Sequence, residues 1–334
     1  MKKYNIREKV FQEPITILDG GTGTEIQRLG GVMSSAWGAL ANIKSPEVVL
    51  RVHENHIKAG CEIITTNSFS TCRHALDAIG QGDQVKKINS EAVRLARKAI
   101  QNTGAEDKVY VAGSMSNFFS LLDNEFRPDP RFIPDAKTEQ KNYRELAKIL
   151  ADSGVDLLIL ELLVDIDHSK RLLEAAMETG LPVWVGLSCC KNKNDDSVVG
   201  RNFSVEKIKS LIYDEGEFPE APKLLPEDKI IPLKEIILSL KSVGGDVFGI
   251  MHSWFDDSKA GLEILKENWD GPIMFYPEIM LFDTSTGGAK ITSTEQEFAE
   301  SCHKIMDNRV KIVGGCCGVS DSHLKALVKK VSPS

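Results

Sequence analysis

Short apolar segments alternate with longer amphipathic segments along nearly the whole chain of 334 residues. The apolar segments are rich in β-forming residues, and they begin near Ile15, Cys61, Lys108, Asp156, Pro182, Asp246, Pro272 and Val310. Apolar strands that alternate with helices are typical of a parallel sheet whose outer face is covered by those helices. Eight such units predict an α/β fold, a (β/α)8 TIM barrel formed as a single domain by residues 1–334. A doubly wound open sheet is the alternative.

The spacing between strands is interrupted once, between the fifth and sixth predicted strands. Residues 191–228 are rich in Asn, Asp, Glu, Pro and Lys, which predicts a long insertion after strand 5 with a helical turn or more around residues 204–213. A separate domain is the alternative, but this segment is too polar to form a core alone. Residues 117–135 are rich in Phe and Pro, so we expect an irregular loop that can cover the barrel mouth as a lid.

Composition excludes several classes of protein. The 41 basic and 48 acidic residues give a net charge of −7, which offers nucleic acid no attraction. No segment resembles a membrane span, and the first residues lack the apolar core of a signal peptide. The seven cysteines form no spaced framework, so we expect reduced thiols. These observations favour a cytoplasmic enzyme with no nucleic-acid or membrane partner; a homo-oligomer is compatible with them.

Two adjacent cysteines stand in a glycine-rich turn, Gly314-Gly315-Cys316-Cys317-Gly318, directly after the predicted strand that begins at Val310. Neighbouring residues on a strand point to opposite faces, so both thiols can reach one centre only where the backbone leaves the strand, and glycine permits that. Two thiolates directed at one point indicate a soft metal, with zinc as the first candidate. The alternative is a pair of small, buried and inert cysteines.

This turn resembles the glycine-framed cysteine pair of the homocysteine S-methyltransferase family, which includes betaine-homocysteine and S-methylmethionine-homocysteine methyltransferases and the first module of cobalamin-dependent methionine synthase. Three other segments also resemble family motifs, and they occur in the family's order: Asp19 to Glu25, Ala59 to Phe69, and Gly154 to Glu161. The chain is therefore identified from its sequence as a member of this family.

The resemblance implies a Zn²⁺ site that contains Cys316 and Cys317. Family members typically carry an Asn-Cys pair at the end of the sixth strand, where this chain has His252. Imidazole is a good zinc ligand, so His252 is the expected third ligand. Cys189 or Cys190, at the end of the fifth strand, is an alternative, and the absence of a tight zinc site is another. His53 and His56 lie on a helix outside the barrel, so we expect them to be packed or solvated rather than metal-bound.

The resemblance also implies a substrate site at the carboxyl ends of the strands. Asp19 would hold the homocysteine amino group, and the Gly20-Gly21 turn would bring backbone amides near its carboxylate. Glu161 would also anchor the ammonium group, although a strand-end carboxylate paired with a basic neighbour is the alternative. Trp37 would lie near the methyl donor, where its ring can attract an onium group. Polar residues would line the wall: Thr66, Asn67, Ser68, Ser114 and Asn117.

The implied reaction is methyl transfer from an activated donor, a sulfonium or quaternary ammonium compound, to the thiol of homocysteine, which gives methionine. Zinc would hold the thiol as a thiolate, so no catalytic residue is expected beyond the metal site. Tyr276-Pro277 is followed by Glu278, whereas the family often has Asn-Ser-Gly there, which indicates a divergent branch. The alternatives are a methyltransferase subunit that uses a methyl-corrinoid protein in trans and a metal-free binding module.

Overall fold

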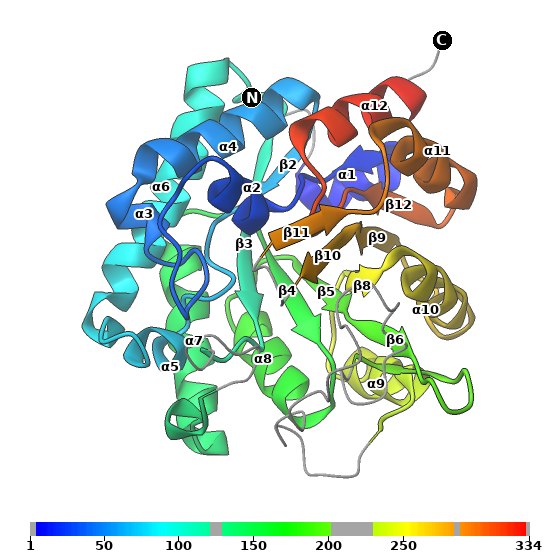
Figure 1. Ribbon diagram of the computed structural model, residues 1–334. Coiled ribbons are helices and arrows are strands. Elements are labelled where there is room, and N and C mark those ends of the chain that lie inside the picture. Colours follow the sequence, from blue (N-terminus) through cyan, green and yellow to red (C-terminus); the bar gives the residue numbers. More distant parts are fainter. Residues whose placement is uncertain (1–4, 121–128, 202–229, 284–287, 332–334) are drawn as a thin grey trace.

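A closed barrel of eight parallel strands forms the centre of the computed structural model, which describes residues 5–120, 129–201, 230–283 and 288–331 (Figure 1). The strands follow one another around the barrel in the order β1-β12-β9-β8-β5-β4-β3-β2. A bridge between Leu18 and Ile63, and a 2.8 Å hydrogen bond from the Glu62 amide to the Ile17 carbonyl, join β1 to β2 and close the ring. The (β/α)8 prediction is confirmed, because the edge strands of an open sheet would not meet.

Each barrel strand begins within two residues of its predicted start. The strands are β1 (Thr16–Ile17), β2 (Ile63–Thr65), β3 (Tyr110–Ser116), β4 (Leu157–Leu163), β5 (Val183–Leu187), β8 (Val247–Trp254), β9 (Ile273–Glu278) and β12 (Val310–Val313). This agreement follows from their sequence, since strands buried on both faces read as unbroken apolar runs.

Amphipathic helices cover the outside of the barrel (Figure 1). The long helices are α4 (Pro46–Ala59), α6 (Val85–Thr103), α7 (Ala136–Asp152), α8 (Asp167–Met177), α9 (Leu233–Lys241), α10 (Phe255–Asn268), α11 (Glu295–Ile305) and α12 (Asp321–Val331). Shorter helices lie in the connections: α2 (Thr22–Arg28), α3 (Ala41–Lys44), α5 (Arg73–Asp77), and the 3₁₀ turns η1 (Gly82–Gln84) and η2 (Pro130–Phe132). The apolar faces of the long helices and the outward-facing strand residues form the larger hydrophobic core.

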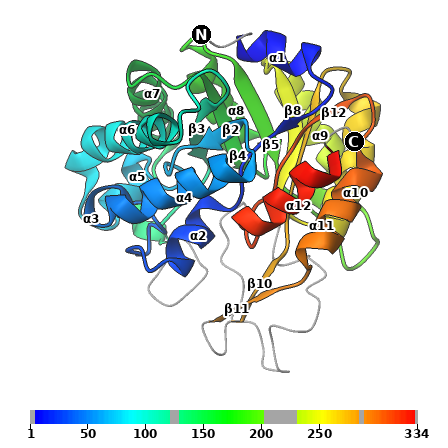
Figure 2. The same ribbon diagram turned by 90° about the horizontal axis from the view of Figure 1, so that it is seen from above.

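A second core fills the barrel itself. It contains inward-facing strand residues such as Leu157, Trp184 and Met274, together with Ile6 and Val10 of α1 (Ile6–Gln12). Helix α1 thus closes one end of the barrel, and the hairpin of β10 (Met280–Asp283) and β11 (Gly288–Ile291) lies at the other (Figure 2). The interior is packed with side chains, so a ligand must bind at a barrel mouth.

The long connection from β5 to β8 includes the predicted insertion, residues 191–228, of which the structure describes 191–201. The connection begins with an antiparallel hairpin, β6 (Cys189–Lys191) with β7 (Val198–Gly200), and ends with α9. The predicted helical turn around residues 204–213 lies outside the described residues, as do residues 121–128 of the predicted lid. A second hairpin, β10 (Met280–Asp283) with β11 (Gly288–Ile291), follows β9 and was not predicted from the sequence.

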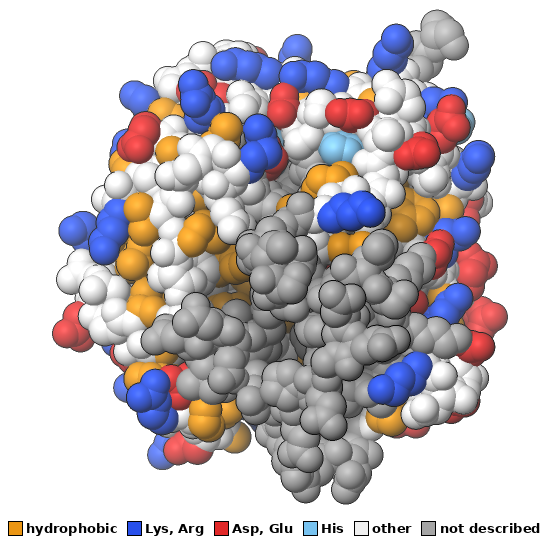
Figure 3. Space-filling view, viewed as in Figure 1, with side chains coloured by type: hydrophobic (Ala, Val, Ile, Leu, Met, Phe, Trp, Pro, Cys, Tyr) orange, Lys and Arg blue, Asp and Glu red, His pale blue; other side chains and the backbone are white. Residues whose placement is uncertain are grey.

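The visible face in Figure 3 carries basic and acidic side chains interspersed around its rim. Within the described part of the chain, no helix has both the length and the apolar character needed to cross a bilayer.

Candidate functional site

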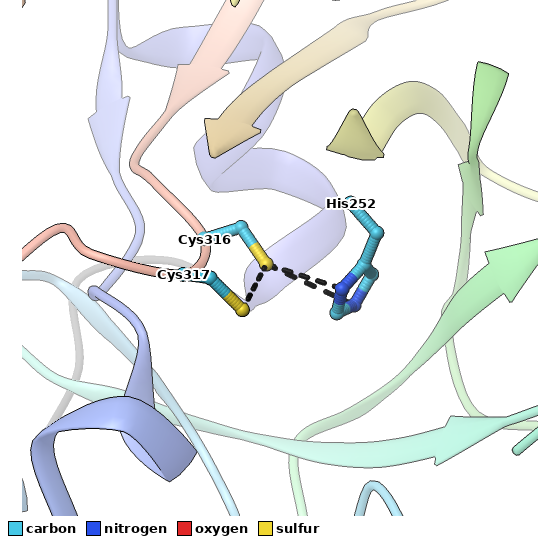
Figure 4. Close-up of side chains that lie close together, drawn as sticks. All are labelled: His252, Cys316 and Cys317. Atoms are coloured by element: carbon cyan, nitrogen blue, oxygen red, sulfur yellow. Dashed lines mark hydrogen bonds between the residues drawn. The ribbon is translucent and has the colours of Figure 1, made fainter. Parts of the chain in front are cut away.

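The structure brings together the three side chains predicted to bind a metal. Cys316 and Cys317 follow β12, and His252 lies near the end of β8 (Figure 4). The Cys316 Sγ atom lies 3.2 Å from His252 Nδ1 and 3.8 Å from Cys317 Sγ. One ligand atom from each residue falls within 4.8 Å of the others, and the described residues contain no second group of three or more His, Cys, Asp or Glu side chains of this kind.

A local break in strand geometry turns His252 toward this group. Along β8, Phe248 and Ile250 pack in the outer core, whereas Val247 and Met251 face the barrel interior. Strict alternation would therefore point residue 252 outward. Its backbone instead has φ of +43°, and the register with β9 shifts between Met251 and Trp254. Such bulges re-aim side chains next to active sites, and a left-handed non-glycine residue costs on the order of 1–3 kcal/mol.

Backbone hydrogen bonds join the cysteine turn to the end of β9. The Cys316 amide donates to the Pro277 carbonyl at 2.8 Å, and the Ile279 amide donates to the Cys317 carbonyl at 2.9 Å. The predicted glycine pair after β1 packs against the same turn, and a Cβ on Gly21 would lie 2.7 Å from the Cys316 carbonyl oxygen. Glycine is therefore required there by the close approach of two backbones.

His252, Cys316 and Cys317 shift one another's pKa values. Hydrogen bonds from Cys316 and from His252 lower the pKa of Cys317 despite its burial, whereas burial and the neighbouring Cys317 thiolate raise the pKa of Cys316. Burial opposes the charge of His252, but Cys317 and Glu161 outweigh it and raise the pKa of His252 to about 10. These shifts favour a proton on His252 and disfavour one on Cys317.

The donor set fits zinc. Two thiolates and one imidazole are the ligand types that Zn²⁺ takes in proteins, and three protein ligands leave a fourth position for a substrate. The group lies at the carboxyl ends of β8 and β12, where chemistry occurs in this fold.

Glu161 lies beside the candidate metal-binding group, which consists of His252, Cys316 and Cys317. Its Oε2 is 2.8 Å from His252 Nε2, and its Oε1 accepts a hydrogen bond from the Ser114 hydroxyl. The carboxylate thus has a basic neighbour, His252. This contact agrees with the alternative interpretation of Glu161 as a strand-end carboxylate paired with a basic residue. Its predicted contact with a substrate ammonium group stays a prediction.

Asp19 is fully buried, with 0% of its surface exposed. Its Oδ2 accepts hydrogen bonds from the Thr65 amide at 2.7 Å and the Thr65 hydroxyl at 2.9 Å, and the Tyr276 hydroxyl donates to its Oδ1 at 3.3 Å. His56 Nδ1 lies 3.8 Å from the same carboxylate. His53 and His56 are both buried, as expected for packed side chains, but the proximity of His56 to Asp19 was not predicted.

The predicted polar wall mainly ties neighbouring strands and loops together. The Ser114 amide donates to the Thr66 hydroxyl at 3.1 Å, and the Ser68 hydroxyl donates to the Ser114 carbonyl at 2.7 Å. Asn67 donates to the Gly38 carbonyl at 2.9 Å. The Asn117 side chain donates to Ser169 of α8 at 3.1 Å, so it is engaged by the outer helix layer.

The remaining candidates, Trp37, Cys189 and Cys190, are not members of the group formed by His252, Cys316 and Cys317. Trp37 is half-buried, has φ of +51°, and its indole packs directly on Gly23 of α2. Cys189 and Cys190 are fully buried in the β6 strand. The Cys189 Sγ lies 3.5 Å from the Asp257 carbonyl at the start of α10, which places it in the outer core.

Sequence reasoning missed two residues that hold His252. The Phe69 ring lies 5.1 Å from the imidazole, centroid to centroid. Arg201 donates from Nη1 to the His252 carbonyl at 2.6 Å and forms a 2.8 Å ion pair with Glu278. Phe69 ends a family-like motif and was within reach of sequence reasoning, whereas no pattern singles out Arg201 in the polar insertion.

Arg201→Ala is expected to lower the free energy of unfolding by about 3 kcal/mol, because it leaves a buried carboxylate without its cation. The side chains of Arg201 and Glu278 are only 10% and 6% exposed. Denaturant unfolding of the variant measures the loss. The double variant Arg201→Ala/Glu278→Gln should recover part of it, since the buried charge of Glu278 is then removed as well. Wild-type stability in Arg201→Ala would contradict this prediction.

Known proteins resemble the chain over nearly its whole length. The family model described as homocysteine S-methyltransferase matches residues 16–215 and 232–331. A selenocysteine methyltransferase of Astragalus bisulcatus is 22% identical over 339 residues, which cover 95% of this chain and 92% of that protein. Betaine–homocysteine S-methyltransferase 1 of Mus musculus is 22% identical over 347 residues, which cover 99% of this chain and 75% of that protein.

A homocysteine S-methyltransferase of Escherichia coli K12 is 29% identical over 177 residues, 51% of this chain and 56% of that protein. The crystal structure of the metallated form of the homocysteine methyltransferase MmuM from Escherichia coli superposes with a TM-score of 0.71 at 20% identity. That match covers 98% of this chain and 100% of the other, which shows a shared fold. The family match spans the barrel from β1 to α12, and the chain therefore belongs to the homocysteine S-methyltransferase family and is a methyltransferase.

Proposed function

We propose that this protein is a zinc-dependent S-methyltransferase that moves a methyl group from a sulfonium or quaternary ammonium donor to the thiol of homocysteine and forms methionine. The observation that carries the proposal is the convergence of His252, Cys316 and Cys317 at the carboxyl ends of β8 and β12. Residues 1–334 would act as one homocysteine-binding domain.

His252, Cys316 and Cys317 would hold the metal through one nitrogen and two sulfurs. Zinc bound there would act as a Lewis acid that favours the ionised form of a substrate thiol. The protein itself would contribute positioning, since the irregular backbone at His252 and the hydrogen-bonded cysteine turn keep the three side chains close together. Little reorganisation is then needed at the moment of reaction.

Two carboxylates give this mouth the charge that a substrate ammonium group requires. Glu161 is 7% exposed and adjoins the metal-binding group directly, so it is the more accessible partner. Asp19 is bonded to Thr65 and would act through the local field and through the position of the Gly20-Gly21 turn. Trp37 would form part of the donor side, where an aromatic face attracts an onium group.

The test combines metal analysis with product formation. Freshly purified protein is expected to contain close to one zinc per chain and to form methionine from homocysteine when S-methylmethionine, betaine or a dimethylsulfonium compound is supplied. Cysteine and selenocysteine as alternative acceptors determine how strictly the thiol is selected. A zinc-loaded protein that turns over only with a methyl-corrinoid protein would reject the small-molecule donors. Protein that binds no zinc and transfers no methyl group would reject the whole proposal.

A further inference from the structure

The two ring nitrogens of His252 face different partners. Nδ1 is directed at the thiols, 3.2 Å from Cys316 Sγ, whereas Nε2 lies 4.0 Å from that sulfur and 2.8 Å from Glu161 Oε2. We propose that Glu161 is a positioning residue for the metal site: it accepts the Nε2–H of His252 and so directs the Nδ1 lone pair at the metal. This inference rests on the proposed metal-dependent function and assigns Glu161 a role that precedes any substrate.

Glu161 is itself held in place for this contact. Its other oxygen accepts the Ser114 hydroxyl, which comes from the adjacent strand β3. The next residue, Leu162, has φ of +60°, and the register between β4 and β5 shifts between Leu160 and Leu163. Irregular backbone therefore occurs at Glu161 and at His252 alike, on two strands that the barrel brings together.

The other contacts of His252 leave the choice of ring nitrogen open. Phe69 packs on the ring and limits its tilt, and Arg201 binds the backbone carbonyl. Neither contact distinguishes a proton on Nδ1 from one on Nε2. A carboxylate only accepts hydrogen bonds, so Glu161 requires the hydrogen on Nε2 and leaves Nδ1 free to bind the metal.

A carboxylate in this position orients the imidazole and raises its basicity, and removing it typically costs about 10–100-fold in metal affinity. A cysteine ligand has no N–H group that a carboxylate could accept, so a carboxylate beside it would not orient it. The histidine at position 252 and the carboxylate at 161 thus form a functional pair in this chain.

The test is the zinc affinity of the full-length protein, measured by competition with a chelator and without homocysteine. Glu161→Ala should weaken zinc binding about 10–100-fold, and Glu161→Gln should fall between it and the wild type, because its amide oxygen still accepts the Nε2–H. Glu139→Ala is the matched control, since Glu139 is a buried carboxylate bonded to another histidine, His168, at 2.6 Å. An unchanged affinity in Glu161→Ala, or an equal loss in Glu139→Ala, would overturn the inference.

A second arm repeats Glu161→Ala in a His252→Cys background. There the substitution should have little further effect on zinc affinity, because the imidazole that it orients is gone. A loss of equal size in both backgrounds would show a general structural role and would refute the pairing. A wild-type protein without measurable zinc affinity would instead reject the metal-dependent function itself, so the two failures are distinguishable.

Discussion

Cys316→Ala and Cys317→Ala are each expected to abolish tight zinc binding and methyl transfer while leaving the barrel folded. Each substitution removes one of only two protein sulfurs in the group, so the loss of zinc affinity should exceed the roughly 100-fold that removal of an outer partner costs. The fold should survive, because the turn follows β12 and is held by backbone hydrogen bonds that alanine retains. Metal analysis after dialysis measures the loss, and circular dichroism checks the fold.

Cys189→Ala is the matched control for these variants. It removes another buried thiol, which lies in the outer core beside α10 rather than in the metal-binding group. The control should keep its zinc even if its stability falls. Full zinc retention in Cys316→Ala or Cys317→Ala would mean that these thiols are inert.

Substitution of His252 should separate the third ligand from its surroundings. His252→Ala should weaken zinc binding by more than about 100-fold, because it removes a ligand and leaves the buried Glu161 without its 2.8 Å partner. His252→Cys should restore zinc binding in part, since it supplies a third sulfur on a shorter side chain. X-ray absorption at the zinc edge should show two protein sulfurs and one imidazole nitrogen in the wild type. A wild-type shell of three protein sulfurs would contradict this assignment and require Cys189 or Cys190.

The His252→Cys variant should also change the pH dependence of the reaction rate. A cysteine thiolate at position 252 adds one negative charge beside the substrate thiol, and a nearby negative charge raises the pKa of an acid. The thiol then ionises at higher pH, so the acid limb of the rate profile should move upward in His252→Cys. Rates measured across pH with homocysteine and an onium donor test this shift. An acid limb that stays in place, or moves downward, would show that the charge at position 252 does not control ionisation of the thiol.

Local sequence determined the barrel and the position of its thiols. Apolar runs such as Leu157–Leu163 occur between amphipathic helices, and this alternation predicted where the strands begin. The prediction was possible because a strand that is buried on both faces consists almost entirely of apolar residues. The Gly314 to Gly318 turn identified the cysteine pair for a similar reason: only glycine allows the close backbone approach that the turn requires. His252 was expected as the third ligand because it stands at a strand end where the resembled family has a cysteine, and imidazole is a good zinc ligand.

Tertiary structure alone decided how these residues meet. Regular alternation would point His252 outward, and its inward direction depends on a left-handed backbone that Arg201 and the neighbouring strands support. The contact between Glu161 and His252 joins β4 and β8, which are 91 residues apart in sequence at this point. The side-chain period of a strand carries no information about where a bulge will form or which strand ends will face each other across a barrel mouth. These features arise from the packing of the closed sheet. The sequence pattern therefore predicted the three candidate ligands, whereas the contact between Glu161 and one of them is decided by the tertiary structure.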